Sequence, residues 1–308
     1  MTPRRAWPAL PFREWQATCD TLHAHTQVLG KLAVVLAPPE PQLQHAALRV
    51  TARGWETRPL PAPDGSGAIG VCLDLHRHQA IVEHDDGRIR QIPLTPDRAV
   101  GAVTRDVLAA VRELAGPVEI NKQPQETEWK TPLDEDVEHA TYDPQHVSVY
   151  FAAATRASQV LAALRAPFRG RSTPVNAWWG SFDLSVELFS GAAADPPSTD
   201  FIMRNSMNVE GIAVGWWPGD PRYPRAAFYG YAYPAADGFG GATLAPEGAR
   251  WETALGEYVL DWDDVVATDD PFATALTFGH SVVAHACAVC GWDPALAGSA
   301  DGIPPPVA

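Results

Sequence analysis

The stretch of the chain that most constrains the fold alternates strictly between apolar and polar residues. Its sequence, WGSFDLSVEL over residues 179–188, has apolar side chains at every second position from 182 onward. Because successive side chains of a β-strand point to opposite faces, this pattern predicts a strand with one buried face and one polar face. The polar side consists of Trp179, Ser181, Asp183, Ser185 and Glu187. That side either meets bulk water or lines a cavity in which a ligand is bound.

The rest of the chain predicts more strands and four helices. The hairpin at 78–94 is the clearest element, because Asp86-Gly87 supplies the positive φ that a tight turn needs between two alternating arms. Residues 97–116 have apolar side chains at three- and four-residue spacing and end at Gly116, as a helix does. Helices are also expected over 12–24, 148–168 and 272–292. Further strands are expected over 27–37, 46–55, 68–75, 117–122, 209–217, 226–234 and 255–262.

The order helix, strands, helix occurs twice along the chain. It predicts an α+β protein of two similar halves, each a mostly antiparallel sheet with helices on one side. LRVTARG at 48–54 resembles LSVELFSG at 184–191, which suggests an internal duplication. The expected division is a first half at 1–121, a polar linker at 122–147, a second half at 148–296 and a disordered tail at 297–308.

Composition and charge narrow the class of protein. The chain has 308 residues, of which 46% are hydrophobic and 19% are charged, as in an ordinary globular protein. Its formal net charge of −14 disfavours nucleic acid and anionic membranes as partners, because both need a basic surface. No run approaches the roughly 18 apolar residues that a membrane span requires. We therefore expect a cytoplasmic protein, and the sequence leaves its cofactor and oligomeric state open.

Metal binding is considered and not favoured. Cys287 and Cys290 form a C-x-x-C with His280 and His285 nearby, but one helix cannot direct all four side chains toward one ion. The closely spaced histidines at 76–84 have charged neighbours, which indicates a solvated hairpin. We expect no metal site in this chain.

Aromatic residues gather on the predicted strands of the second half. Tyr229, Tyr231 and Tyr233 would share one face of the strand at 226–234, and the chain has 11 tryptophans. Tyrosines at a cavity supply an apolar wall and hydrogen-bonding tips together. The same face is equally well explained by a core filled with aromatic side chains.

Several short motifs together resemble the uncharacterised bacterial family DUF5996 over nearly the whole chain. The densest block is P-V-x-x-x-W-G-S-F-D-L at 174–184. Because the Trp179–Asp183 end of the predicted strand lies in this block, we expect that end to face a cavity, and Ser185 and Glu187 to meet solvent. The resemblance implies no activity. The other matching residues are Thr18, Thr21, Leu22, His23, Gln27, Gly30, Lys31, 50–54, Asp136, His139, Tyr142, Asp143, Arg204, Glu210, 215–219, 228–234 and 291–293.

The chain departs from the pattern of this family at three places. The resemblance implies a histidine at the position of Asn176, another at Val209 and a third within 42–44, where this chain has Gln-Leu-Gln. If these histidines bind a metal or transfer protons in relatives, this chain has changed or lost that chemistry. Three coordinated losses also suggest that the positions meet in space.

Three functions fit these observations. The first is an enzyme that acts on a small polar molecule, in one version an anion, with Asp183 and Glu210 as general acid or base. The second is a small-molecule-binding protein with the same aromatic-lined cavity and no turnover. The third is a structural or interaction protein whose Trp and Tyr faces form a subunit interface.

The first two hypotheses share one set of ligand-binding residues. Lys31, Arg53 and Arg204 would clamp a carboxylate or a phosphate. Any of the charged residues is equally explained as half of a structural ion pair. The other expected ligand-binding residues are Trp179, Ser181, Tyr229 and Tyr231 around the cavity, with His139 and Tyr142 in the linker closing over it.

Overall fold

The computed structural model describes residues 6–296. Within this range, twelve strands and six α-helices with antiparallel strand pairing confirm the predicted α+β class. The chain divides into two units: an N-terminal unit (11–152 and 176–183) and a C-terminal unit (the described parts of 1–10, 153–175 and 184–308). The internal duplication is not confirmed. The predicted division into halves and linker stays a prediction, and the predicted tail at 297–308 lies outside the described residues.

The N-terminal unit contains an antiparallel set of strands in the order β7-β1-β2-β4-β5-β6, with β3 paired to β4. The predicted hairpin is confirmed as β5 and β6, and Gly87 takes a φ of 90° in its turn. The strands are β1 (Leu48–Val50), β2 (Gly54–Glu56), β3 (Leu60–Pro61), β4 (Ala68–Asp74), β5 (Gln79–His84), β6 (Ile89–Pro93) and β7 (Asn176–Trp178).

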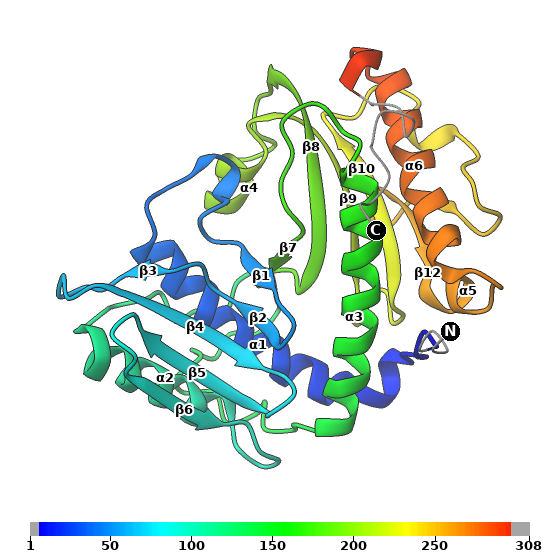
Figure 1. The fold of residues 1–308 in the computed structure, drawn as a ribbon. Helices are drawn as coiled ribbons and strands as arrows, with labels where there is room; N and C mark the ends of the chain where they lie inside the picture. Colours follow the sequence, from blue (N-terminus) through cyan, green and yellow to red (C-terminus); the bar gives the residue numbers. More distant parts are fainter. Residues whose placement is uncertain (1–5, 297–308) are drawn as a thin grey trace, which may run out of the picture. The chain divides into compact units, whose positions relative to one another are not determined.

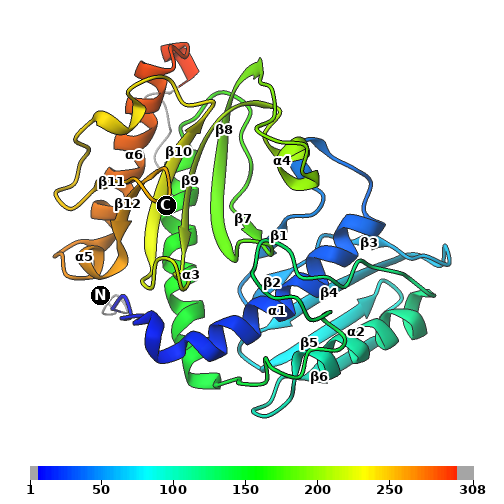
Figure 2. The ribbon, with the colours of Figure 1, turned by 180° about the vertical axis from the view of Figure 1, so that it is seen from behind.

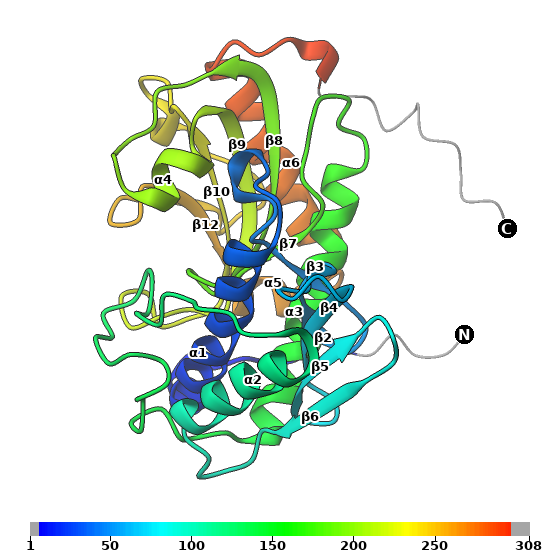
Figure 3. The same cartoon turned by 90° about the vertical axis from the view of Figure 1, so that its left-hand side faces the viewer.

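Two helices of this unit pack on its strands. Helix α2 (Val100–Ala115) buries its apolar side, including Val103 and Val107, against β5 and β6 (Figure 1). Helix α1 (Phe12–Leu36) contacts α2, and the two lie side by side (Figure 3). The start of α3 (Pro144–Arg165) also belongs to this unit.

The prediction of a strand over 27–37 is wrong, because α1 continues through these residues as one helix of 25 residues. A short apolar run is compatible with a buried strand or a buried helix, and nothing between 24 and 27 stops the helix already begun. The helix ends just before Pro38-Pro39, where proline disfavours helical backbone. Gly30 does not open a strand: the Trp179 ring lies where its Cβ would be, so only glycine allows this contact.

Two other predicted strands also differ. Residues 46–55 form two short strands, β1 and β2, joined by a turn in which Thr51 and Gly54 exchange backbone hydrogen bonds of 2.8 and 3.3 Å. Residues 117–122 form no strand. They lie within a segment without regular structure that runs from 116 to 143.

The C-terminal unit contains strands in the order β11-β12-β10-β9-β8. They are β8 (Asp183–Ala193), β9 (Val209–Trp217), β10 (Ala227–Tyr233), β11 (Arg250–Glu252) and β12 (Glu257–Asp261). Helix α6 (Pro271–Val289) packs on one face of β9, β10 and β12 (Figures 1 and 2). Short helices α4 (Phe201–Ser206) and α5 (Trp262–Val266) complete the unit with the 153–165 part of α3.

The alternating stretch forms β8 from Asp183 onward, with its apolar positions buried as predicted. The expectation that Ser185 meets solvent is wrong, because the side chain is buried. Ser185 pairs with Gly215, which pairs with Tyr229, and the Tyr229 ring lies over Gly215 in this row. Glu187 is half-buried.

Two helices, α3 and α6, are apolar and long enough to cross a membrane by length and composition alone. In the most apolar window of 18 residues, the mean hydropathy is 1.2 for α3 and 1.4 for α6. Of the residues in these windows, 50% are buried in α3 and 33% in α6. Core helices of soluble proteins have the same properties, so this observation is weak support for a membrane location. The cytoplasmic location stays a prediction.

Candidate functional site

One face of α1 carries a row of polar side chains. Asp20, His23, Gln27 and Lys31 recur at intervals of three or four residues, which places them on the same side of a helix. Gln27 and Lys31 are 0% and 3% exposed. We call these four residues the polar stripe.

The irregular segment 121–139, here called the strap, runs past helix α1 (Figures 2 and 3). The Gln27 side-chain amide donates to the backbone oxygen of Gln125 at 3.0 Å and accepts from its backbone N–H at 2.9 Å. Further along, Trp129 contacts the rings of His23 and His139, with centroids 5.0 and 4.4 Å away. Side chains of α1 therefore hold a segment that has no secondary structure of its own.

Lys31 is a buried cation. Its Nζ donates to Oε1 of Gln125 at 3.1 Å and lies 5.2 Å from the centre of the Trp179 ring. No carboxylate among residues 6–296 forms an ion pair with it. Burial lowers the pKa of Lys31 to about 8, so the side chain is still mostly charged at neutral pH.

His23 fixes the turn that joins β7 to β8. Its Nε2 lies 3.0 Å from the backbone oxygen of Trp179 and 2.9 Å from that of Gly180. Two carbonyl acceptors require an N–H at Nε2, so this nitrogen donates. The same turn holds Phe182 at a φ of 57°, and the His23 ring stacks on Phe182 with centroids 5.0 Å apart.

The turn positions three of the predicted site residues. Trp179 is buried, and its indole N–H donates to the backbone oxygen of Ala46 at 3.1 Å. Ser181 is exposed and donates to Asp183, which is 5% exposed. Trp179 and Ser181 precede the strand β8 instead of lying on it, so the predicted alternation of these two residues on one strand face is wrong.

His139 and Asp136 form a hydrogen-bonded pair at the end of the strap. Nδ1 of His139 lies 2.6 Å from Oδ2 of Asp136, and this hydrogen bond raises the pKa of His139. Burial acts to raise the pKa of Asp136, but its hydrogen bonds from His139 and Glu138 bring that pKa below its usual range. Burial also raises the pKa of nearby Asp20. An aspartate that orients a histidine in this way is a common acid–base arrangement.

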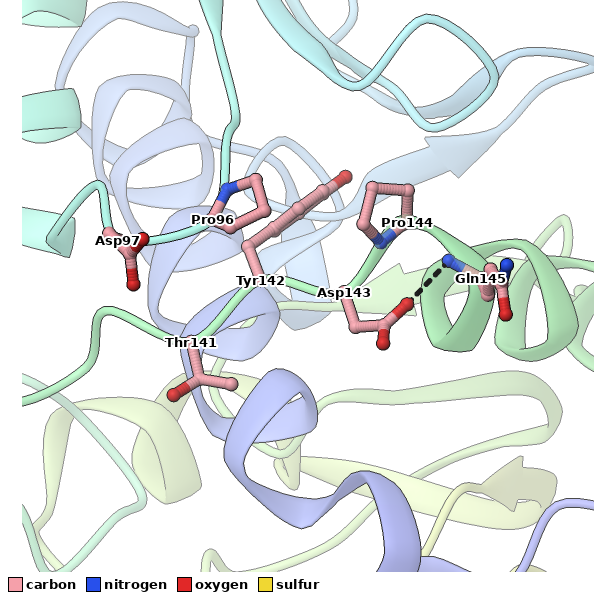
Figure 4. Close-up of a pocket in the computed structure, with 7 residues that line it drawn as sticks. All are labelled: Pro96, Asp97, Thr141, Tyr142, Asp143, Pro144 and Gln145. Atoms are coloured by element: carbon pink, nitrogen blue, oxygen red, sulfur yellow. Dashed lines mark hydrogen bonds between the residues drawn. The ribbon is translucent and has the colours of Figure 1, made fainter.

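An open pocket of about 570 Å³ lies where the chain enters α3 (Figure 4). The ring of Tyr142 lies between Pro96 and Pro144 in this pocket (Figure 4). The Tyr142 hydroxyl is 3.2 Å from Nδ1 of His78. The volume is in the range of small-ligand sites. The lining residues are Pro96, Asp97, Thr141, Tyr142, Asp143, Pro144 and Gln145.

Comparison with known protein families matches residues 7–298 to the "Family of unknown function (DUF5996)". The chain belongs to this family. The comparisons with curated proteins and with solved structures gave no match. Family membership therefore confirms the resemblance and assigns no activity.

The remaining predicted cation of the N-terminal unit is engaged elsewhere in this DUF5996 chain. Arg53 lies in the turn between β1 and β2 and pairs with Glu56 at 3.1 Å and Glu83 at 3.3 Å. Arg53 therefore forms structural ion pairs, which is one of the two roles that the sequence left open. Lys31, Trp179 and His139 lie along α1, whereas no contact brings Arg53 to them among the described residues.

The other predicted residues lie in the C-terminal unit. Oε2 of Glu210 accepts a hydrogen bond from Ser190 at 2.7 Å, and Arg204 is exposed on α4. Tyr229 and Tyr231 are half-buried and stack on each other with ring centroids 6.3 Å apart. Their roles as general acid or base and as ligand-binding residues stay predictions.

Two of the three positions at which a family histidine was expected meet in space. Nδ2 of Asn176 donates to Oε1 of Gln44 at 2.9 Å, and both residues belong to the N-terminal unit. The third, Val209, belongs to the C-terminal unit. Among the described residues no group of three or more His, Cys, Asp or Glu side chains is arranged to hold a metal ion.

Sequence reasoning did not assign a role to several residues of the site. Gln27 and Asp136 were both present in the family-like motifs, so a signal for them existed. Asp20 shares the helical spacing of the stripe, which becomes visible only once α1 is seen to extend through Lys31. Gln125 and Trp129 lie in an irregular segment, where no periodicity points to them.

Proposed function

We propose that this DUF5996 protein binds a small polar molecule, and that the polar stripe of α1 and the strap form the binding site. The observation that carries this proposal is Lys31, a charged side chain 3% exposed whose hydrogen-bond acceptor is a neutral amide. Burying a charge without an opposite charge destabilises a fold, so such a residue is more readily explained by a ligand than by stability.

The strap supports the same proposal. Segments longer than about 12–15 residues without secondary structure are uncommon in compact domains and are often functional loops. This one covers 121–139 within an irregular region that extends from 116 to 143. It lies over buried polar side chains instead of an apolar surface, as a segment that covers a binding site does.

An enzyme acting on a small polar substrate remains part of the proposal. In the N-terminal unit, Asp183 and the His139–Asp136 pair supply groups that can accept or donate a proton. Glu210 would be the corresponding group of the C-terminal unit. A binding protein without turnover requires none of these groups, so substituting His139 separates the two versions.

The cellular setting is proposed on charge. A net charge of −14 favours a soluble bacterial protein of the cytoplasm without a nucleic-acid or membrane partner. This part of the proposal does not affect the location of the binding site.

A second candidate function is a subunit interface in the C-terminal unit. Tyr229 and Tyr231 stack with their rings 9° from parallel, and Trp217 meets Tyr229 edge-on at 5.6 Å. Aromatic side chains that stay half-buried are typical of interfaces. This function predicts an oligomer that dissociates when Tyr231 is replaced by serine.

Native mass spectrometry of freshly purified protein, with metal analysis of the same sample, tests the proposal. We expect a bound small molecule in the wild-type chain and in Lys130→Met, and its loss in Lys31→Met. Lys130 is an exposed lysine of the strap and controls for the change in charge. A small molecule that Lys31→Met retains would place the binding site elsewhere, and a dimer with no ligand would favour the interface.

A further inference from the structure

We propose that Lys31 binds an oxyanion of the ligand, a carboxylate or a phosphate, and that Gln125 is the side chain this oxyanion displaces. This inference rests on the proposed function and names the class of ligand. It assigns to Gln125 a role as a neutral substitute for the ligand in the unbound protein.

Lys31 differs in its partner from three of the buried aspartates. Buried Asp74, Asp136 and Asp261 pair with Arg77, His139 and Arg225 respectively, at N–O distances between 2.6 and 3.0 Å. Among residues 6–296, the partners of Lys31 are the dipole of an amide at 3.1 Å and the face of an indole ring. The described surroundings of Nζ therefore lack the negatively charged partner that would stabilise a buried ammonium most.

Gln125 Oε1 already occupies the position that an oxygen of such an anion would take. A carboxylate or phosphate oxygen in its place would form a charge-assisted hydrogen bond, which is roughly twice as strong as a neutral one. The oxyanion therefore competes favourably with the amide for Lys31.

Displacing the Gln125 side chain does not require the strap to unfold. The backbone N–H and C=O of Gln125 are held separately, by the side chain of Gln27. Gln125 is partly exposed, whereas Lys31 behind it is buried. Rotation of this one side chain toward solvent would free Nζ from its hydrogen-bond acceptor, and the backbone anchors would remain.

The surroundings of Nζ favour recognition by local contact. The Trp179 ring beside it is fixed by its hydrogen bond to Ala46 and by close contact with Gly30. With a net charge of −14, the chain as a whole repels anions, so nonspecific accumulation of anions near the site is not expected.

Gln125→Glu tests the inference directly, because it places a carboxylate beside Lys31 without changing the shape of the side chain. Gln123→Glu is the matched control: an exposed glutamine of the strap, two residues away, that acquires the same charge. The measurement is the urea midpoint of each protein, in chloride and in sodium phosphate or sodium malonate at equal ionic strength.

We expect Gln125→Glu to raise the midpoint in chloride above that of the wild type and of Gln123→Glu. We also expect phosphate or malonate to stabilise the wild type and Gln123→Glu, with an apparent affinity at least tenfold weaker in Gln125→Glu. Lys31→Met should lose the same stabilisation, and Lys130→Met should keep it.

Equal midpoints for the two glutamate variants, or equal anion stabilisation of Lys31→Met and Lys130→Met, would overturn the inference. The proposed function fails separately. A neutral or cationic compound that co-purifies with the wild type and remains bound to Gln125→Glu, but is lost from Lys31→Met, would keep the binding site and overturn its assignment to oxyanions. A compound that Lys31→Met retains would overturn both.

Discussion

The two units bury very different kinds of side chain. Of the polar and charged residues that are buried within 6–296, nearly all belong to the N-terminal unit, and only Thr173, Ser185 and Asp261 belong to the C-terminal unit. The units are of similar size, so the difference does not follow from the amount of interior. Buried polar groups stabilise a fold only when they are fully paired. Their concentration in one unit therefore suggests that function, and not stability alone, shapes its interior.

Helices α1 and α6 show the contrast at close range. The buried residues of α6 are Ala275, Phe278, Gly279, Val282, Val283 and Ala286, all apolar or glycine. The buried residues of α1 include Thr18, Thr21, His25, Thr26, Gln27 and Lys31. Both helices cover strands of their own unit and also contact an irregular segment, but in different ways. Helix α6 meets the loop at 234–249 through the partly exposed His285 and Ser281, whereas α1 meets the strap through the buried Gln27 and Lys31. Helix α6 stabilises its unit, whereas α1 stabilises its unit and carries the candidate site.

The largest effect is expected at Asp261, the one buried charged residue in the described part of the C-terminal unit. Asp261 accepts from Tyr223 at 2.5 Å and pairs with Arg225 and Arg250 at 2.9 and 3.1 Å. Replacing Asp261 by alanine should lower the free energy of unfolding by about 2–4 kcal/mol, because it removes the acceptor that three side chains share. Urea denaturation measures this loss.

Ligand binding by Asp261→Ala should be unchanged, which is what makes this variant informative about the two units. Asp264→Ala, at an exposed position of α5, controls for the lost charge and should change stability little. If Asp261→Ala remained as stable as Asp264→Ala, the paired charge of Asp261 would not stabilise the C-terminal unit, and its contrast with the unpaired charge of Lys31 would fail.

Lys31→Met should have the opposite effect on stability. Because the native state holds this charge away from water without a counter-ion, its removal should raise the free energy of unfolding at pH 7 by about 1–3 kcal/mol. The pKa of Lys31 is about 8 in the folded chain, below its ordinary value of 10.5. Between these values the unfolded chain binds more protons, so wild-type stability should rise with pH from about 8 to 10.5.

Lys31→Met should lack this rise, and Lys130→Met should retain it. Urea midpoints measured at intervals between pH 7 and 10.5 provide the comparison. A loss of stability in Lys31→Met at pH 7 would show that Lys31 has a structural role, and would weaken the contrast between the units.

The sequence predicts regular elements better than it predicts the site. Helices α2 and α3, the β5–β6 hairpin and strand β10 follow from periodicity that each segment carries by itself. The apolar run at 27–37 was ambiguous, because its helical character depends on continuity with 12–24 and on the fit of Gly30 against Trp179, 149 positions later. Contacts between distant segments are not encoded in local spacing.

The same distinction applies to the site residues. Lys31, Trp179 and His139 were predicted from chemical type and family-like motifs, and the structure places them along one helix. Arg53 has the same chemical type, yet its position in a tight turn leads it to Glu56 and Glu83. Gln125 is a neutral residue in an irregular segment, so only its contact with Lys31 indicates a role.

His139→Gln is expected to have a smaller effect that depends on pH. The hydrogen bond to Asp136 raises the pKa of His139, so the pair stabilises the fold below the unfolded pKa and this contribution is lost as pH rises through the folded pKa. We expect the variant to be less stable than the wild type by about 1 kcal/mol at pH 5.5, and by less at pH 8. His146→Gln is the control, since His146 lies 3.8 Å from Asp143 at a more exposed position. An equal loss at both values of pH would indicate that His139 contributes through packing with Trp129 alone.

The smallest effect should come from Arg53→Met, which compares two cations of the same unit. Side chains of Arg53 and Glu83 are 33% and 41% exposed, and ion pairs of this kind contribute roughly 0–1 kcal/mol. Arg53→Met should therefore change the urea midpoint little and leave bound ligand in place, whereas Lys31→Met raises the midpoint and loses the ligand. Loss of ligand from Arg53→Met, measured by native mass spectrometry, would extend the site beyond α1 and the strap. Retention of the ligand would show that a positive charge is not sufficient for ligand binding. The feature that separates Lys31 from Arg53 would then be its burial without a counter-ion.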